Sequence, residues 1–121
     1  MTEKIDRILR AFEKQGRYYA GELLLTPQDA VSLIHELETA NVVVTGVNLW
    51  YLIDGRPVES TLYLVLPEDN YGADNAARAR EFILSEVPGK LQRGEVPEIP
   101  SADLYSVDFP NSLSIVEGLN L

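Results

Sequence analysis

The side chains with catalytic potential in this sequence are few, and their spacing does not support catalysis. His35 is the only histidine, and its neighbours Ser32, Glu36 and Glu38 place it on the polar side of a helical pattern. A general base needs an adjacent nucleophile or an orienting carboxylate, and the sequence supplies no such partner for His35. We interpret His35 as a solvated surface residue, and we expect no catalytic residue and no enzyme.

The carboxylates and the glycines also lack the patterns of known cofactor sites. Carboxylate pairs such as Glu36 with Glu38 have the spacing of solvated faces, and Asp69 to Asp74 lacks the alternate ligands and closing glutamate of a calcium loop. The absence of cysteine and the single histidine exclude thiolate zinc sites, thiol catalysis and multi-histidine metal sites. We therefore expect no metal and no cofactor.

Charge and length narrow the class of protein further. Ten basic and nineteen acidic residues give a net charge of −9, which argues against binding to nucleic acid or to an anionic membrane. A chain of 121 residues predicts a single domain that spans residues 1–121. No apolar run reaches the roughly 18 residues of a spanning helix, and no signal-peptide pattern opens the chain. We expect a cytoplasmic location.

Two helices are predicted in the first third of the chain. Apolar residues at intervals of three and four indicate the first, from Glu3 to Lys14. The second has the clearest start, because Thr26 can cap it, Pro27 suits its first position and Asp29 completes a capping box. We expect it to end near Asn41 and to bury four residues: Ala30, Leu33, Ile34 and Leu37.

A third helix is expected after residue 73. Asp74 or Asn75 can cap it, and Pro88-Gly89 follows Val87, so the helix is predicted to stop there. Its apolar residues have helical spacing: Ala76, Ala79, Ile83 and Val87. An extended loop is expected over residues 90–101, which are rich in proline and glycine.

A β-hairpin is predicted between the second and third helices. The segment Val42–Ile53 is rich in β-branched and aromatic residues, and Asp54-Gly55 is the strongest two-residue turn signal. The returning strand is expected over Val58–Leu66. A third strand is predicted over residues 104–109, while residues 17–25 and 112–121 are open between strand and packed loop. The order indicates an α+β fold: a mostly antiparallel sheet of three to five strands with about three helices on one face.

The hairpin register predicts which side chains face away from the helices. A regular turn pairs Trp50 with Glu59 and Gly46 with Tyr63, and it directs Val47, Leu49 and Tyr51 towards the core. Trp50 is then either exposed as an aromatic anchor or covered by another element. A slip of one residue would exchange the two faces.

The segment from Thr26 to Tyr51 also carries a resemblance. A capped helix, a short link and a strand with Gly46-Val47-Asn48-Leu49-Trp50 resemble the bacterial immunity protein 40 family. The likeness covers roughly residues 17–60, about a third of the chain. It implies a protein that neutralises a cognate toxin in polymorphic or contact-dependent toxin systems.

We therefore expect an immunity-type protein that occludes a basic toxin domain. The alternative is a small protein-binding or dimerising structural module. We expect the contact surface on the outer face of the hairpin and in the loop after it, because these segments carry aromatic rings and carboxylates. The expected partner-binding residues are Trp50, Glu59, Tyr63, Glu68, Asp69 and Tyr71.

Overall fold

The computed structural model describes residues 2–67, 72–95 and 103–109. These residues form five strands and three helical rods, and the third rod joins α3, a π-helical turn and α4 without a break. The α+β class predicted from the sequence is confirmed. In chain order the elements are α1 (Thr2–Phe12), β1 (Arg17–Tyr19), β2 (Glu22–Leu24), α2 (Pro27–Thr39), β3 (Gly46–Ile53), β4 (Arg56–Val65), α3 (Gly72–Glu81), η1 (Phe82–Glu86), α4 (Val87–Gln92) and β5 (Asp103–Asp108).

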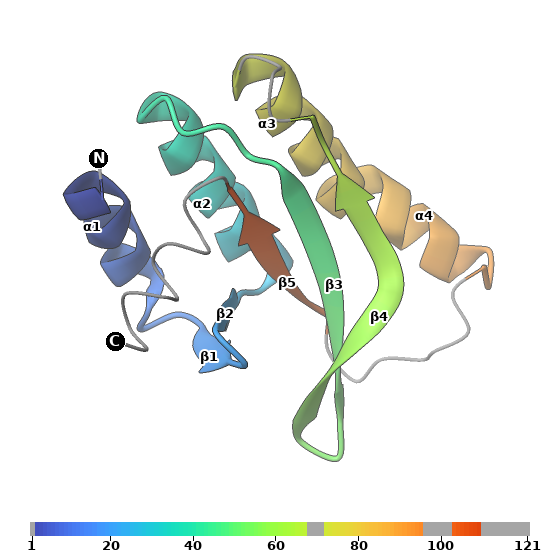
Figure 1. Cartoon of the computed structure of the whole chain (residues 1–121). Coiled ribbons are helices and arrows are strands. Elements are labelled where there is room, and N and C mark those ends of the chain that lie inside the picture. Colours follow the sequence, from blue (N-terminus) through green and yellow to red (C-terminus); the bar gives the residue numbers. More distant parts are fainter. Residues whose placement is uncertain (1, 68–71, 96–102, 110–121) are drawn as a thin grey trace.

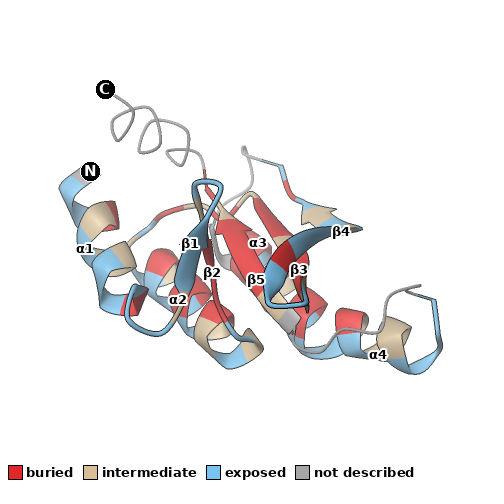
Figure 2. Ribbon diagram, turned by 90° about the horizontal axis from the view of Figure 1, so that it is seen from below, coloured by how far each residue is buried: buried red, intermediate tan, exposed pale blue. Residues whose placement is uncertain are grey.

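The strands make two small antiparallel sheets. The larger has the order β4-β3-β5, and the smaller is the β1-β2 ribbon. Helix α2 and the rod that contains α3 and α4 lie on one side of the larger sheet, as Figure 1 shows, and α1 packs against α2. The core between them is formed from Val47, Leu49 and Tyr51 of β3 and from the buried faces of the helices. Figure 2 shows buried residues concentrated where the sheet meets α2 and α3.

Helix α2 begins and ends where its sequence signals indicate. Thr26 Oγ1 accepts a hydrogen bond from the Asp29 N–H at 3.3 Å, and Pro27 occupies the first turn. At the other end Asn41 has a φ of 60°, and the Val42 N–H donates to the Leu37 carbonyl at 2.8 Å. These contacts make a Schellman cap, which satisfies carbonyl groups at the helix end. The four predicted core residues of this helix are all buried.

The predicted end of the third helix at Pro88-Gly89 is wrong. The rod continues to Gln92 through a π-helical turn, in which the Val87 N–H donates to the Phe82 carbonyl five residues before it. Proline lacks an N–H, and that loss is harmless in the first turn of a helix. Pro88 lies in the first turn of α4, so the π turn lets the rod pass it.

The predicted start of the third helix is also wrong: α3 begins at Gly72, so Asp74 and Asn75 lie inside it and neither is its N-cap. Asn75 has a different role. Its side chain is buried, and its Nδ2 donates to the Val44 carbonyl at 2.9 Å and to the Pro67 carbonyl at 2.8 Å. One amide thus ties the segment before β3 and the segment after β4 to α3.

The predicted hairpin is confirmed at its turn and shortened at its start. Asp54 and Gly55 both have positive φ, 51° and 79°, as a tight hairpin turn requires. The strand begins at Gly46 rather than at Val42, because Val42 still belongs to the cap of α2 and donates its N–H to the Leu37 carbonyl.

The register is regular only in the half of the hairpin nearer the turn. Trp50 pairs with Glu59 as predicted, but Asn48 pairs with Tyr63, and Val65 rather than Tyr63 lies opposite Gly46. Four residue steps on β4 therefore match two steps on β3. The Ser60 hydroxyl accepts the Leu62 N–H at 3.0 Å within the bulge. Because the insertion has even length, the paired residues beyond it, Tyr63 to Val65, keep their predicted faces.

Residues 17–25 form the β1-β2 ribbon, which turns at Ala20 and Gly21 with positive φ at both. The chain then joins the larger sheet at its β5 edge. Leu25 and Tyr105 exchange two backbone hydrogen bonds of 2.9 and 2.7 Å, in an antiparallel bridge. The third predicted strand is confirmed as β5, at Asp103–Asp108.

Several sequence predictions fall outside the described residues. These are residues 96–101 of the loop expected over residues 90–101, the tail at residues 112–121 and the acidic segment that holds Glu68, Asp69 and Tyr71. Residues 90–92 of the expected loop belong instead to α4. Among the helices that the structure describes, none has the length and apolar character needed to span a membrane.

Candidate functional site

The outer face of the larger sheet, on the side away from the helices, gathers polar and aromatic side chains from three strands. Residues paired across an antiparallel sheet point to the same face. The pairing of Asn48 with both Tyr63 and Ser106 therefore places these three side chains on one face. The pairing of Trp50 with Glu59 adds two more. We call these residues, together with Val65 and Asp108, the outer face.

The Ser106 hydroxyl is the centre of a hydrogen-bond network on this face. Its oxygen accepts from Trp50 Nε1 at 3.0 Å and from Asn48 Nδ2 at 3.3 Å. Asn48 Nδ2 also donates to Asp108 Oδ2 at 2.9 Å. Ser106 is fully buried, so these bonds satisfy a hydroxyl that water does not reach. The network holds β3 and β5 side chains in fixed positions.

Trp50 does not form an exposed anchor, and this part of the sequence prediction is wrong. Its side chain is only 6% exposed. Tyr19 of the β1-β2 ribbon covers it, with ring centroids 6.0 Å apart and planes at 75°. The alternative that another element covers this face is the one that the structure shows. Trp50 thus packs beneath the ribbon and contributes to the fold.

Glu22 pairs with Tyr19 in the β1-β2 ribbon and lies close to the hydrogen-bond network of Ser106. Burial is the main cause that raises the pKa of Glu22 to about 7, and the negative charges of Asp108 and Glu59 raise it further. A hydrogen bond from Ser106 acts in the opposite direction and lowers it. Glu22 therefore changes charge near neutral pH at the point where the ribbon meets the sheet.

The exposed part of the outer face lies on β4. Tyr63 is 59% exposed and Val65 is 73% exposed, two residues apart on the same face of the strand. Glu59 is exposed on this strand as well. An apolar pair beside carboxylates is the composition of a protein-recognition surface, in which aromatic side chains supply contact area and the rim is polar.

Of the six residues expected at the contact surface, the structure places three on the outer face. Glu59 and Tyr63 are exposed there, and Trp50 is buried beneath the ribbon. Residues that the sequence argument missed are Asn48, Ser106, Asp108 and Glu22. The first three had a signal, since polar side chains alternate along both predicted strands. Glu22 had none, because the sequence did not place the ribbon against the sheet.

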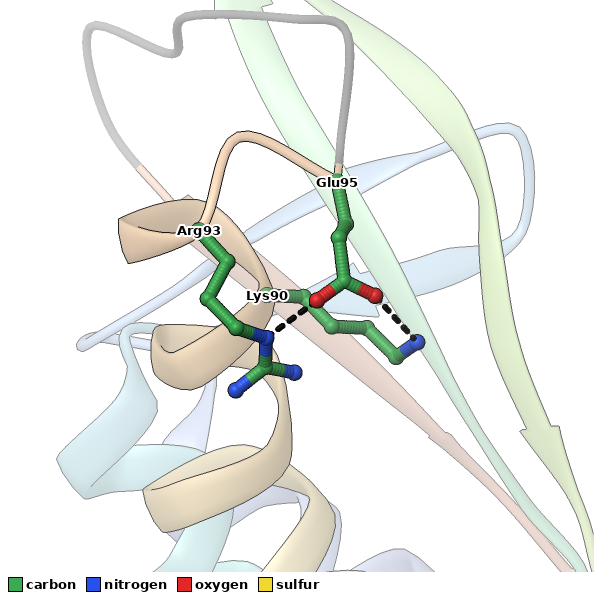
Figure 3. Close-up of polar contacts among 3 residues, drawn as sticks. All are labelled: Lys90, Arg93 and Glu95. Carbon is green, nitrogen blue, oxygen red and sulfur yellow. Dashed lines mark hydrogen bonds and ion pairs between the residues drawn. The ribbon is translucent and has the colours of Figure 1, made fainter.

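The remaining charged clusters in the described part of the chain are surface features. Figure 3 shows Glu95 between Arg93 and Lys90 at the end of α4, where the Lys90 Nζ lies 3.7 Å from a Glu95 oxygen. The hydrogen bond from Arg93 is the main cause that lowers the pKa of Glu95. His35 is exposed on α2. Within residues 2–67, 72–95 and 103–109 no group of three histidine, cysteine or acidic side chains is arranged to hold a metal ion.

Comparison with family models, with curated proteins and with solved structures found no match for this chain.

Proposed function

We propose that this chain is a protein-binding domain of the immunity type, which neutralises a toxin domain by covering part of its surface. The observation that carries the proposal is the exposed pair Tyr63 and Val65, 59% and 73% exposed, on a strand that also presents Glu59. A large exposed aromatic side chain next to an aliphatic one is costly in water and gains most from a partner. The resemblance to immunity protein 40 supports the kind of partner.

The charge of the chain supports a basic partner. A net charge of −9 on 121 residues creates a negative field that speeds encounter with a positive surface. Glu59 and Asp108 add negative charge on the same face of the sheet as the exposed pair. We therefore propose a basic toxin domain as the partner, rather than nucleic acid or a membrane. We also propose that the two proteins meet in the cytosol.

The test begins with capture by the wild-type protein and by Tyr63→Ala, followed by binding measurements with the purified partner. We expect Tyr63→Ala to weaken binding about 30-fold, as loss of an interface anchor does. Tyr18→Ala is the matched control, because Tyr18 is 50% exposed but bonds to Glu13 near the end of α1. Equal affinity of Tyr63→Ala and Tyr18→Ala would contradict the proposed surface.

Two further measurements test the kind of partner. Raised salt should slow association strongly, because the screening length falls to about 3 Å near 1 M. Expression of this chain should also protect cells that produce the captured protein. A salt-independent association rate would count against a basic partner, and a captured protein without toxicity would count against the immunity role.

A self-associating structural module is the second candidate. The observation that favours it is that β4 lies at the margin of its sheet, where a second copy can pair with it. Two copies of charge −9 repel each other, which makes this candidate the weaker one. Sedimentation equilibrium of the purified chain separates the two, since the module predicts a dimer and the inhibitor a monomer.

A further inference from the structure

The two edges of the larger sheet differ. The β5 edge is occupied at Tyr105, which makes a backbone bridge with Leu25. The opposite edge belongs to β4, which pairs with β3 alone among the strands of the described chain. Figure 1 shows β4 at this margin of the sheet. An edge strand of this kind can pair with another extended chain.

The direction of the backbone groups along β4 follows from one hydrogen bond. The Leu66 N–H donates to the Thr45 carbonyl at 2.9 Å, so Leu66 directs its peptide groups towards β3. In an antiparallel pair, successive residues direct their N–H and C=O groups to opposite sides. The peptide groups of Leu64 therefore also face β3. The position of its carbonyl oxygen agrees, because a Cβ atom added to Gly46 of β3 would lie only 3.0 Å from it. Tyr63 and Val65 direct their peptide groups outwards.

Only one half of this edge carries the features that prevent pairing. Pro57, which has no N–H, and the charged Glu59 lie in the half nearer the turn. Both features are common protections of an edge strand. The other half, Leu62–Val65, contains neither a charge nor a proline. The bulge at Ser60 separates the two halves.

We infer that an extended segment of a basic partner adds to β4 as a fourth strand, with backbone hydrogen bonds to Tyr63 and Val65. This inference rests on the proposed function and specifies how the partner binds. The side chains of such a segment would alternate between the outer face, where Tyr63 and Val65 are exposed, and the opposite side. The net charge of −9 favours a basic segment over a second copy of this acidic chain.

Amide exchange of the full chain tests the edge directly. In the free protein the amides of Tyr63 and Val65 should exchange rapidly, whereas those of Leu64 and Leu66 should be protected. The probe is a short peptide of alternating lysine and valine, and at millimolar concentration it should shift and protect Tyr63 and Val65. The same peptide with N-methyl groups at alternate residues should not. Protection of both amides in the free protein, or no effect of the unmodified peptide, would overturn the inference.

A proline variant separates backbone pairing from side-chain contact. Val65→Pro removes an outward N–H and leaves the bonds to β3 in place, so the unfolding midpoint should stay close to that of wild type. Val65→Ala is the matched control, because it shortens the side chain and keeps the N–H. We expect Val65→Pro to bind the peptide, and the captured partner, about tenfold more weakly than Val65→Ala.

The outcomes for the two proposals differ. If Tyr63→Ala weakens partner binding but Val65→Pro and Val65→Ala bind equally, the outer face binds the partner and edge pairing is wrong. If neither change alters partner binding, the proposed contact surface itself is wrong. A dimer of the free chain that Val65→Pro abolishes would assign the edge to a second copy and overturn the basic segment.

Discussion

The ring of Tyr19 stands at 75° to the indole of Trp50, with their centroids 6.0 Å apart. Tyr19 belongs to the β1-β2 ribbon and Trp50 to β3, so this contact joins the two sheets across the outer face. The indole N–H continues the connection to β5, because it donates to the Ser106 hydroxyl. Trp50, which the sequence suggested as a binding anchor, thus connects the ribbon, β3 and β5 within the fold.

The first prediction concerns the stability contribution of Trp50. Trp50→Ala should lower the free energy of unfolding by about 3–5 kcal/mol, because it removes a buried aromatic side chain and leaves a cavity. Trp50→Phe should cost less, since it keeps most of the packing and loses the bond to Ser106. Urea unfolding measures both. The emission of this single tryptophan should also be blue-shifted and resistant to quenching, and an exposed indole would contradict the structure.

The second prediction concerns pH. Glu22 has an ordinary pKa of 4.5 when unfolded and about 7 when folded, so the folded state binds its proton more tightly. Its contribution to stability is fully present below pH 4.5 and is lost as the pH rises to about 7. We expect Glu22→Gln to flatten this part of the profile. After allowance for solvent screening, the gain above neutral pH should be roughly 1–2 kcal/mol.

The profile is measured by urea unfolding at a series of pH values for wild type and Glu22→Gln. Glu3→Gln is the control, because Glu3 is exposed on α1 far from this network. Parallel profiles for wild type and Glu22→Gln would show that Glu22 titrates alike in both states.

The third prediction concerns Asn75. Asn75→Ala leaves the carbonyls of Val44 and Pro67 without their shared donor, and a buried unsatisfied group costs about 1–3 kcal/mol. Denaturant unfolding should show a loss in this range. The neighbouring Asp74 is exposed, so Asp74→Ala should change stability by no more than about 0.5 kcal/mol. Equal effects of the two changes would mean that Asn75 does not bridge these segments.

The fourth prediction concerns the start of α2. Thr26→Ala removes the oxygen that accepts the Asp29 N–H and should cost about 1 kcal/mol. Thr26→Ser retains that oxygen and should recover most of the loss. Thermal unfolding of the three proteins measures the difference, and a Thr26→Ala protein as stable as wild type would exclude a capping role.

Local signals predicted most of the fold. The cap of α2 and the turn at Asp54-Gly55 each depend on a few adjacent residues, and both occur as expected. The assignment of Val47, Leu49 and Tyr51 to the core also holds, because strand alternation alone decides it. Fold class followed from the order of these elements.

Features that depend on distant residues could not be predicted in the same way. The position of the β1-β2 ribbon over Trp50 depends on contacts between segments some thirty residues apart, and no local pattern encodes them. The register change on β4 has only Ser60-Thr61 as a local hint. The elevated pKa of Glu22 needs both the ribbon and β5 in place. The strands that carry the candidate site were therefore predicted, whereas the element that covers Trp50 was left open and could not be identified from the sequence.

The register change on β4 has an evolutionary consequence. Insertion or deletion of an even number of residues at Ser60 leaves every later side chain on its own face, whereas an odd number would turn the apolar side outwards. Related genes can therefore gain or lose two codons at this position while the helices remain packed on the same face of the sheet. We expect length variation among related chains at this position to occur in steps of two residues.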